Sequence, residues 1–136
     1  MKDDTPMSVK CPRVVVADDE MVMRMFITSL LKKMNYEVVG QACNGNEAVS
    51  LYRETRPDLL LLDINMPLKT GEEALKEIRA EFPDARIVML TSVADAATVQ
   101  SVIAHGAAGY IRKDSSVNEI KTIISEALQA EGGSSP

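Results

Sequence analysis

The sequence lacks tryptophan and contains only one histidine and two cysteines. A zinc site or an iron–sulfur cluster needs several Cys or His ligands at short spacings, and this sequence offers no such cluster. Cys11 and Cys43 lie far apart in the chain and form no CxxC motif. We therefore expect two reduced structural thiols rather than a disulfide or a pair of metal ligands.

The chain also lacks a net positive charge and a long apolar run. It has 15 Lys and Arg residues against 20 Asp and Glu residues, which gives a net charge of −5. Nucleic acids and anionic membranes require a clustered positive field, so we expect neither as a direct partner, and DNA binding would need another domain. No run reaches the ~18 apolar residues that cross a bilayer, and residues 1–11 contain no signal-peptide core. A cytoplasmic protein is expected.

What the chain does have is a regular alternation of short β-branched or leucine-rich runs with stretches of helical periodicity. The runs typical of strands are Arg13–Ala17, Tyr36–Ala42, Asp58–Leu62, Arg86–Thr91 and Gly109–Ile111. Apolar strands joined by helices predict a parallel sheet that is covered on both faces, with right-handed crossovers. We expect one α/β, doubly wound (βα)5 domain over residues 12–130, with a flexible extension at 1–11 and a disordered tail at 131–136.

Polar and methionine residues indicate further details of the helices. Asn44 or Asn46 is expected to cap the second helix, and Ser115 or Ser116 the fifth, because Asn and Ser side chains accept hydrogen bonds from the first turn. Several of the eight methionines lie in the run Met21–Met25. We interpret them as core-filling residues rather than as an exposed binding stripe.

Acidic residues follow two of the most apolar runs. Asp18 and Asp19 come directly after the first predicted strand, and Asp63 ends the third. Ligands of doubly wound sheets bind beyond the carboxyl ends of the strands, and the three carboxylates meet there if the strand order is 2-1-3-4-5. Such a cluster needs a hard cation or a cationic side chain to offset repulsion. Thr91 and Lys113 end or follow the fourth and fifth strands, which predicts a metal-assisted phosphoryl-acceptor site.

Five motifs in order make the chain resemble the CheY-like receiver domains of two-component response regulators, over nearly all of residues 12–130. The matching pieces are Val-Ala-Asp18-Asp19-Glu20, Leu-Leu-Asp63-Ile-Asn-Met-Pro67 with Gly71, Met-Leu-Thr91-Ser92, and Gly109-Tyr110-Ile-Arg-Lys113. The resemblance implies a flavodoxin-like fold with Asp63 as the phosphoacceptor. It also implies that Mg²⁺ is bound by Asp18, Asp19, Asp63 and the backbone carbonyl of Asn65. Thr91 and Lys113 would hold the phosphoryl oxygens.

The same resemblance implies a phosphorylation-activated signalling switch. A sensor histidine kinase or a phosphotransfer protein would supply the phosphoryl group, and the domain would at most lose its own phosphoryl group rather than act as an enzyme. Thr91 and Tyr110 match the switch residues of the family. The affected face would combine the strand Gly109–Ile111 with the fourth and fifth helices, where a downstream protein, an output domain or a second receiver docks. The native protein is expected to be a monomer or a phosphorylation-dependent dimer, and either a stand-alone receiver or part of a regulator with a DNA-binding output domain.

One class of enzyme shares this combination of residue types, and one residue of the chain departs from the family pattern. Haloacid-dehalogenase-type phosphatases also combine an aspartate nucleophile, Mg²⁺, a hydroxyl and a lysine on a parallel sheet. They carry a second aspartate two residues after the nucleophile, where this chain has Asn65, and their acidic pair follows the nucleophile rather than preceding it. In addition, receivers commonly have proline after the lysine, through a cis peptide, whereas Asp114 follows Lys113 here. We expect this bond to be trans or to be strained into cis, at a cost of about 2.5 to 4 kcal/mol.

Overall fold

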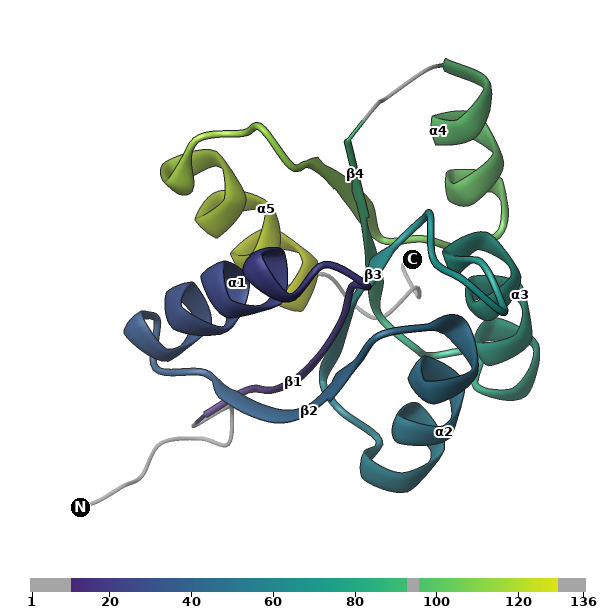
Figure 1. Cartoon of the computed structure of the whole chain (residues 1–136), viewed down its shortest axis with the longest axis horizontal. Coiled ribbons are helices and arrows are strands. Elements are labelled where there is room, and N and C mark those ends of the chain that lie inside the picture. The colour runs from purple at the N-terminus through teal and green to yellow at the C-terminus, as the bar shows by residue number, and fades with distance from the viewer. Residues whose placement is uncertain (1–10, 93–95, 130–136) are drawn as a thin grey trace.

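Strands and helices alternate along the chain. The computed structural model describes residues 11–92 and 96–129, so the expected extension, apart from Cys11, and the expected tail lie outside the described residues. The strands are β1 Arg13–Ala17, β2 Glu37–Ala42, β3 Leu59–Asp63, β4 Ile87–Thr91 and β5 Gly109–Arg112. The helices are α1 Met21–Lys33, α2 Gly45–Thr55, α3 Gly71–Glu81, α4 Ala96–Ala104 and α5 Val117–Gln129 (Figure 1). The predicted strands are confirmed to within one residue at either end.

All strand pairs are parallel, and the sheet order is β2-β1-β3-β4-β5, as predicted. The chain passes from β1 to β2 on one side and then crosses back to place β3 on the other side of β1. Ala17 pairs with Leu62 in this register, so the residues that follow them lie side by side at the carboxyl edge. The order of the strands therefore reverses beside β1, which is where doubly wound sheets bind their ligands.

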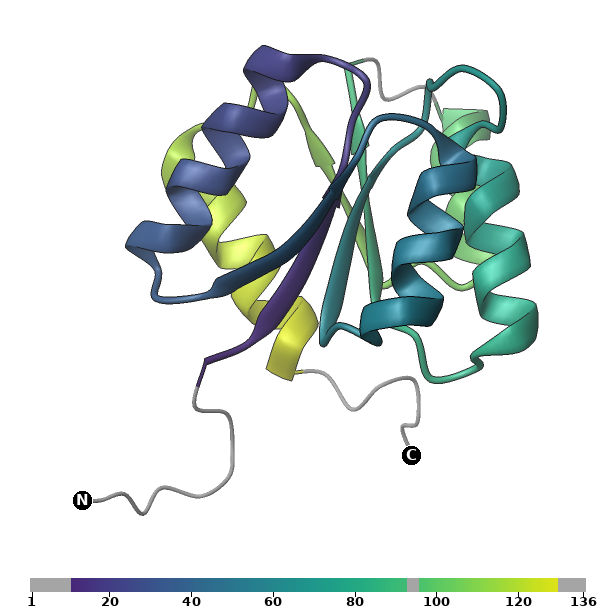
Figure 2. The ribbon, with the colours of Figure 1, turned by 60° about the horizontal axis from the view of Figure 1, so that its bottom comes forward.

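Helices cover both faces of the sheet, with α1 and α5 on one face and α2, α3 and α4 on the other (Figure 2). Successive side chains of a strand point to opposite faces, so each central strand contributes to both cores. In β3, Leu59 and Leu61 pack against α1 and α5, whereas Leu60 and Leu62 pack on the other side. All residues of β3 and β4 are buried, which explains why these strands are apolar without alternation.

Side-chain caps fix the first turns of α2, α3 and α5. Asn44 accepts a hydrogen bond from the Glu47 N–H at 2.8 Å, which confirms one of the two predicted caps of α2. Thr70 and Glu73 form a reciprocal capping box at the start of α3. At α5 the backbone N–H of Glu119 donates to the hydroxyl of Ser116 at 3.1 Å, so Ser116 rather than Ser115 is the cap. These caps hold the loops that surround the carboxyl edge of the sheet.

The prediction that the methionine run fills the core is wrong for two of its members. Met21 and Met25 are 62% and 61% exposed, and Val22 and Phe26 beside them are exposed as well. Only Met23 packs against the core, because the buried stripe of α1 continues from it through Ile27 and Leu30 at helical spacing. The outer face of the first half of α1 is therefore apolar.

The two cysteines agree in part with the expectation of reduced structural thiols. Cys11 and Cys43 are free, as predicted, but both are exposed, so they do not fill the core. Within the described ranges, no helix has the length and apolar character needed to cross a bilayer.

Candidate functional site

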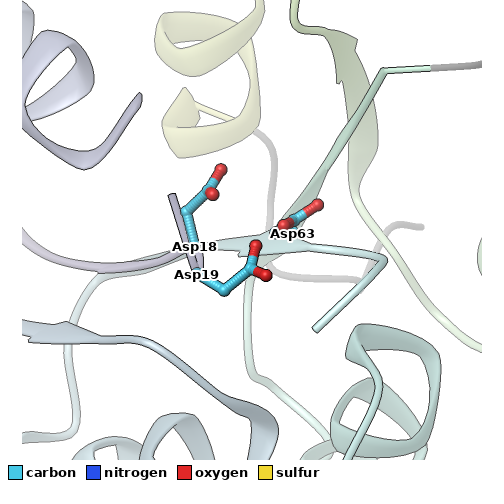
Figure 3. A group of neighbouring side chains, drawn as sticks. All are labelled: Asp18, Asp19 and Asp63. Atoms are coloured by element: carbon cyan, nitrogen blue, oxygen red, sulfur yellow. The ribbon is translucent and has the colours of Figure 1, made fainter. Parts of the chain in front are cut away.

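The three predicted acidic residues meet at the carboxyl edge of the sheet. Asp18 follows β1 and is fully buried, Asp63 is the last residue of β3 and is also buried, and Asp19 is exposed. One carboxylate oxygen from each lies within 4.8 Å of the other two (Figure 3). The parallel register of β1 with β3 produces this cluster, because it brings the ends of the two strands together.

Hydrogen bonds hold Asp18 in a fixed orientation. Its backbone N–H donates to the carbonyl of Ala42 at 3.0 Å, and its Oδ1 accepts from the N–H of Glu20 at 2.8 Å. Its carbonyl accepts from the guanidinium of Arg24 at 2.8 Å. The second carboxylate oxygen, Oδ2, is buried and accepts no hydrogen bond of good geometry from the described residues. This oxygen is therefore left to interact with a positive charge.

The ammonium group of Lys113 supplies one such charge. Its Nζ lies 2.8 Å from Oδ2 of Asp18 and 3.4 Å from Oδ2 of Asp63, and the side chain is only 13% exposed. The contact with Asp18 is an ion pair. The backbone N–H of Lys113 donates to the carbonyl of Thr91 at 2.8 Å, which ties the loop after β5 to the end of β4. The Lys113–Asp114 peptide is trans.

Burial and charge act in opposite directions on the two central groups. Burial and the charge of Asp18 raise the pKa of Asp63, and although Lys113 and the Asn65 N–H lower it, the net result is a pKa of about 7. For Lys113, burial lowers the pKa, but the contact with Asp18 and the charges of Asp63, Asp18 and Glu20 outweigh it and raise the pKa above its usual value. The acidic charges of the site therefore exceed what one ammonium group neutralises.

The loop after Asp63 returns to the sheet through a glycine. The backbone N–H of Gly71 donates to the carbonyl of Ile64 at 2.8 Å, and a Cβ atom at Gly71 would lie 1.9 Å from the carbonyl oxygen of Asp63. Only a residue without a side chain fits there. Leu68 in the same loop has φ of 68° and is 80% exposed, a backbone conformation that costs a branched apolar residue free energy. No sequence pattern indicated that Leu68 adopts it.

The remaining predicted residues lie around this centre. Thr91 is the buried last residue of β4. Tyr110 on β5 pairs in register with Met89, and the residue is 37% exposed. The N–H of Asn65 donates to Oδ1 of Asp63 at 3.3 Å, so Asn65 lies beside the acidic cluster. That the backbone carbonyl of Asn65 binds the metal stays a prediction.

Sequence reasoning did not assign a role to Glu20. Its Oε1 lies 3.4 Å from Nζ of Lys113, so a third acidic side chain reaches this ammonium group. The signal in the sequence was a third acidic residue directly after Asp18 and Asp19.

These residues form a site that fits a hard divalent cation. Mg²⁺ prefers oxygen ligands, and carboxylates with few competing hydrogen bonds are suitable donors. Asp18, Asp19 and Asp63 offer converging oxygens. Oδ2 of Asp18 is in addition buried and accepts no hydrogen bond from the part of the chain that the structure describes. A cation would also offset the repulsion that raises the pKa of Asp63.

Comparisons with known proteins agree on the family of this chain. Residues 14–125 match the response regulator receiver domain family. The chain is 41% identical over 101 residues to the chemotaxis protein CheY of Thermotoga maritima, covering 74% of this chain and 84% of that protein. It is 33% identical over 122 residues to the transcriptional regulatory protein LnrK of Bacillus subtilis, covering 89% of this chain and 54% of LnrK.

A solved structure of a two-component response regulator of the LuxR family from Aurantimonas sp. SI85-9A1 is similar in fold and sequence. It has a TM-score of 0.84 and 32% identity, and the match covers 88% of this chain and 86% of that chain. These similarities do not support the haloacid-dehalogenase-type phosphatase. The motifs at the strand ends, the strand order and the sequence match agree, and the chain therefore belongs to the response regulator receiver domain family of two-component signalling.

Proposed function

We propose that this receiver domain is a phosphorylation-activated switch in which Asp63 accepts a phosphoryl group from a histidine kinase or a phosphotransfer protein, in a reaction that needs Mg²⁺. The observation that carries the proposal is the placement of Asp63. Its buried carboxylate lies 3.4 Å from the Lys113 ammonium and within 4.8 Å of the carboxylates of Asp18 and Asp19. A candidate nucleophile, a positive charge and carboxylates that could bind a cation thus lie together at the carboxyl edge of the sheet.

The residue types match the requirements of phosphoryl transfer. Asp63 attacks phosphorus as an anion although the incoming group is also negative, so positive charge must offset their repulsion. Asp18, Asp19, Asp63 and the carbonyl of Asn65 would hold Mg²⁺, which supplies part of that positive charge. Lys113 adds a point charge on the same phosphoryl group. The hydroxyl of Thr91 donates a further hydrogen bond.

The first prediction is stoichiometric labelling. With acetyl phosphate and Mg²⁺, the chain is expected to retain about one phosphoryl group per molecule, on Asp63, because an aspartyl phosphate forms without turnover. Label is measured by intact-mass spectrometry and located by peptide mapping. Asp63→Asn or an excess of EDTA is expected to abolish it, whereas Asp84→Asn, which removes an exposed carboxylate outside the described site, is expected to leave it intact.

Undiminished label in Asp63→Asn, or full label in EDTA, would contradict the proposal. Continuous release of phosphate from monoesters by the wild type would favour a phosphatase instead. Apart from slow loss of its own phosphoryl group, we propose no enzymatic turnover.

The free energy of the bonds that a phosphoryl group can form is comparable to the free energy needed to shift the domain between two conformations. The phosphoryl group on Asp63 carries about −1.5 to −2 charges. New charge-assisted bonds to Thr91 and Lys113 contribute about 1.5 to 3 kcal/mol each, or about 3 to 6 kcal/mol together. Moving a two-state equilibrium from 1:99 to 99:1 takes about 5.5 kcal/mol, so two such bonds are of the right size to shift the equilibrium if they form mainly in the active state. Movement of Thr91 toward the phosphoryl group would leave space that Tyr110 fills by rotating inward.

Thr91→Ala is expected to separate phosphorylation from the conformational change. The mutant should still accept a phosphoryl group on Asp63, because the nucleophile and the cation ligands remain. The chemical-shift changes that phosphorylation spreads through residues 96–125 in NMR spectra should shrink strongly. Thr91→Ser, which keeps the hydroxyl, is the matched control and should respond as the wild type does. Changes in Thr91→Ala as extensive as those of the wild type would show that the hydroxyl does not couple the two regions.

The face that we propose to carry the signal is formed by α4, β5 and α5. Ile103, Tyr110 and Val117 expose apolar surface on these three elements in turn. A downstream protein, an output domain or a second receiver would dock there, so the protein is a monomer or a phosphorylation-dependent dimer. CheY and LnrK illustrate two outcomes, since one is a chemotaxis protein and the other a longer transcriptional regulatory protein.

A further inference from the structure

Glu20 occupies the N-cap position of α1, but its side chain caps nothing. The backbone of Glu20 is held by its N–H, which donates to Oδ1 of Asp18 at 2.8 Å, and by its carbonyl, which accepts from the N–H of Arg24 at 3.0 Å. No hydrogen bond joins its carboxylate to the first turn of the helix. Its Oε1 instead lies 3.4 Å from Nζ of Lys113, a residue 93 positions away in the chain.

This carboxylate differs from the other acidic groups that contact Lys113. Asp18 and Asp63 are buried, whereas the side chain of Glu20 is 65% exposed. Glu20 also lies outside the cluster of converging oxygens that would hold a cation. A cation bound by that cluster would therefore not be coordinated by the carboxylate of Glu20.

During phosphoryl transfer the negative charge of Glu20 loses its ion-pair partner. In the structure the ammonium of Lys113 is shared by Glu20 and two buried carboxylates. When Lys113 turns to the oxygens of an incoming phosphoryl group, Glu20 keeps its negative charge but loses its partner. Like charges repel over several ångströms in a partly solvated environment, so this charge acts on the donor itself.

We propose that Glu20 selects phosphodonors by charge. Its carboxylate disfavours small dianionic donors relative to donors of lower net negative charge, such as compounds in which the phosphoryl group is bonded to nitrogen. The inference rests on the proposed function, since it concerns what delivers the phosphoryl group to Asp63. A phosphorylated imidazole with a protonated ring is one such donor. Small acyl phosphates are dianions at neutral pH and meet the full repulsion.

Two small donors test this difference. An oxygen of the Asp63 carboxylate attacks phosphorus in both, and an aspartyl phosphate forms. In acetyl phosphate the P–O bond to the acyl group breaks, and acetate leaves with the electron pair. In phosphoramidate, a monoanion overall with a protonated nitrogen, the P–N bond breaks, and ammonia leaves with the electron pair.

The experiment compares initial labelling rates of the full chain with each donor at saturating Mg²⁺ and low ionic strength. For Glu20→Gln, the ratio of the acetyl phosphate rate to the phosphoramidate rate is expected to rise about three- to sevenfold. This range corresponds to one unit charge at about 7 Å and an effective dielectric constant of about 40 to 80. The difference from the wild type is expected to shrink as salt is added, because the Debye length falls to about 8 Å at physiological ionic strength.

Two variants make the result specific. Glu54→Gln removes the same charge from an exposed position in α2 and is expected to leave the ratio unchanged. Glu20→Asp keeps the charge with a shorter side chain and is expected to keep the wild-type ratio.

A Glu20→Gln variant that changes both rates by the same factor would overturn the inference and assign Glu20 a structural role in α1. A Glu20→Asp ratio equal to that of Glu20→Gln would also overturn it, since charge is the proposed cause. Absence of label in the wild type with both donors would overturn the proposed function itself, whereas an unchanged ratio overturns this inference alone.

Discussion

In EDTA at pH 8, Asp63→Asn is expected to have a larger free energy of unfolding than the wild type, by about 1 to 3 kcal/mol. The carboxylate of Asp63 is buried beside Asp18, and its pKa in the folded chain is raised from 3.8 to about 7. Ionising it at pH 8 therefore destabilises the folded state, and one pKa unit corresponds to about 1.4 kcal/mol. Asparagine has a similar shape without the charge.

The pH dependence distinguishes this cause from a general effect of the substitution. Between about pH 4 and pH 7 the folded wild type binds more protons at Asp63 than the unfolded chain does, so its stability falls as the pH rises. The difference between Asp63→Asn and the wild type should grow over this range, as measured by urea unfolding. It should be absent for Asp84→Asn, an exposed aspartate, and should narrow when Mg²⁺ is added. A difference that does not vary with pH would contradict the electrostatic explanation.

Gly71→Ala is expected to lower the free energy of unfolding by about 3 kcal/mol or more. The new Cβ would lie 1.9 Å from the carbonyl oxygen of Asp63 and 2.8 Å from the Cα of Ile64. Both are backbone atoms, so the clash is relieved only if the chain moves, and overpacking of this kind typically costs about 1 to 3 kcal/mol and occasionally more. The same movement would displace Asp63, so labelling by acetyl phosphate should fall as well.

Gly109→Ala is the matched control. A Cβ atom there would meet only Cγ2 of Ile123 at 3.9 Å, an ordinary contact, so the stability should change by less than about 1 kcal/mol. Denaturant unfolding of both variants, together with labelling of Asp63, measures the two effects. A Gly71→Ala protein as stable as Gly109→Ala would show that the loop after Asp63 moves at little cost in free energy.

The sequence predicted the fold because its hydrophobic pattern and its polar interruptions agree. Runs such as Leu59–Leu62 are apolar on both faces and stop at a carboxylate, which locates both the strand and the edge where it ends. Once five such runs alternate with helices, the strand order that unites Asp18 and Asp63 also follows. These features depend on local spacing, and local spacing is visible in a sequence.

One prediction is wrong, and two features of the structure were not predicted. Met21 and Met25 have the composition of core residues, but the rotation of α1 on the sheet turns them outward. Glu20 has the sequence position of a helix cap, but its side chain contacts Lys113, because the side chain of Lys113 reaches from the end of β5 across the carboxyl edge of the sheet to the residues that follow β1. Leu68 adopts its positive φ in the loop that returns to the sheet at Gly71. The contact of Glu20 and the conformation of Leu68 have no periodic signature, whereas the helical spacing of Met23, Ile27 and Leu30 does mark the buried stripe that excludes Met21 and Met25.

The capped helix starts described above have an electrostatic consequence. Each helix follows a parallel strand and runs back along it, so the helices begin at the edge that carries Asp63 (Figure 2). Aligned peptide dipoles give each helix about half a positive charge at its start. The backbone therefore adds a positive potential at this edge that no substitution of a side chain removes. Variants that lack the Lys113 ammonium should accordingly retain part of the attraction for a phosphoryl group.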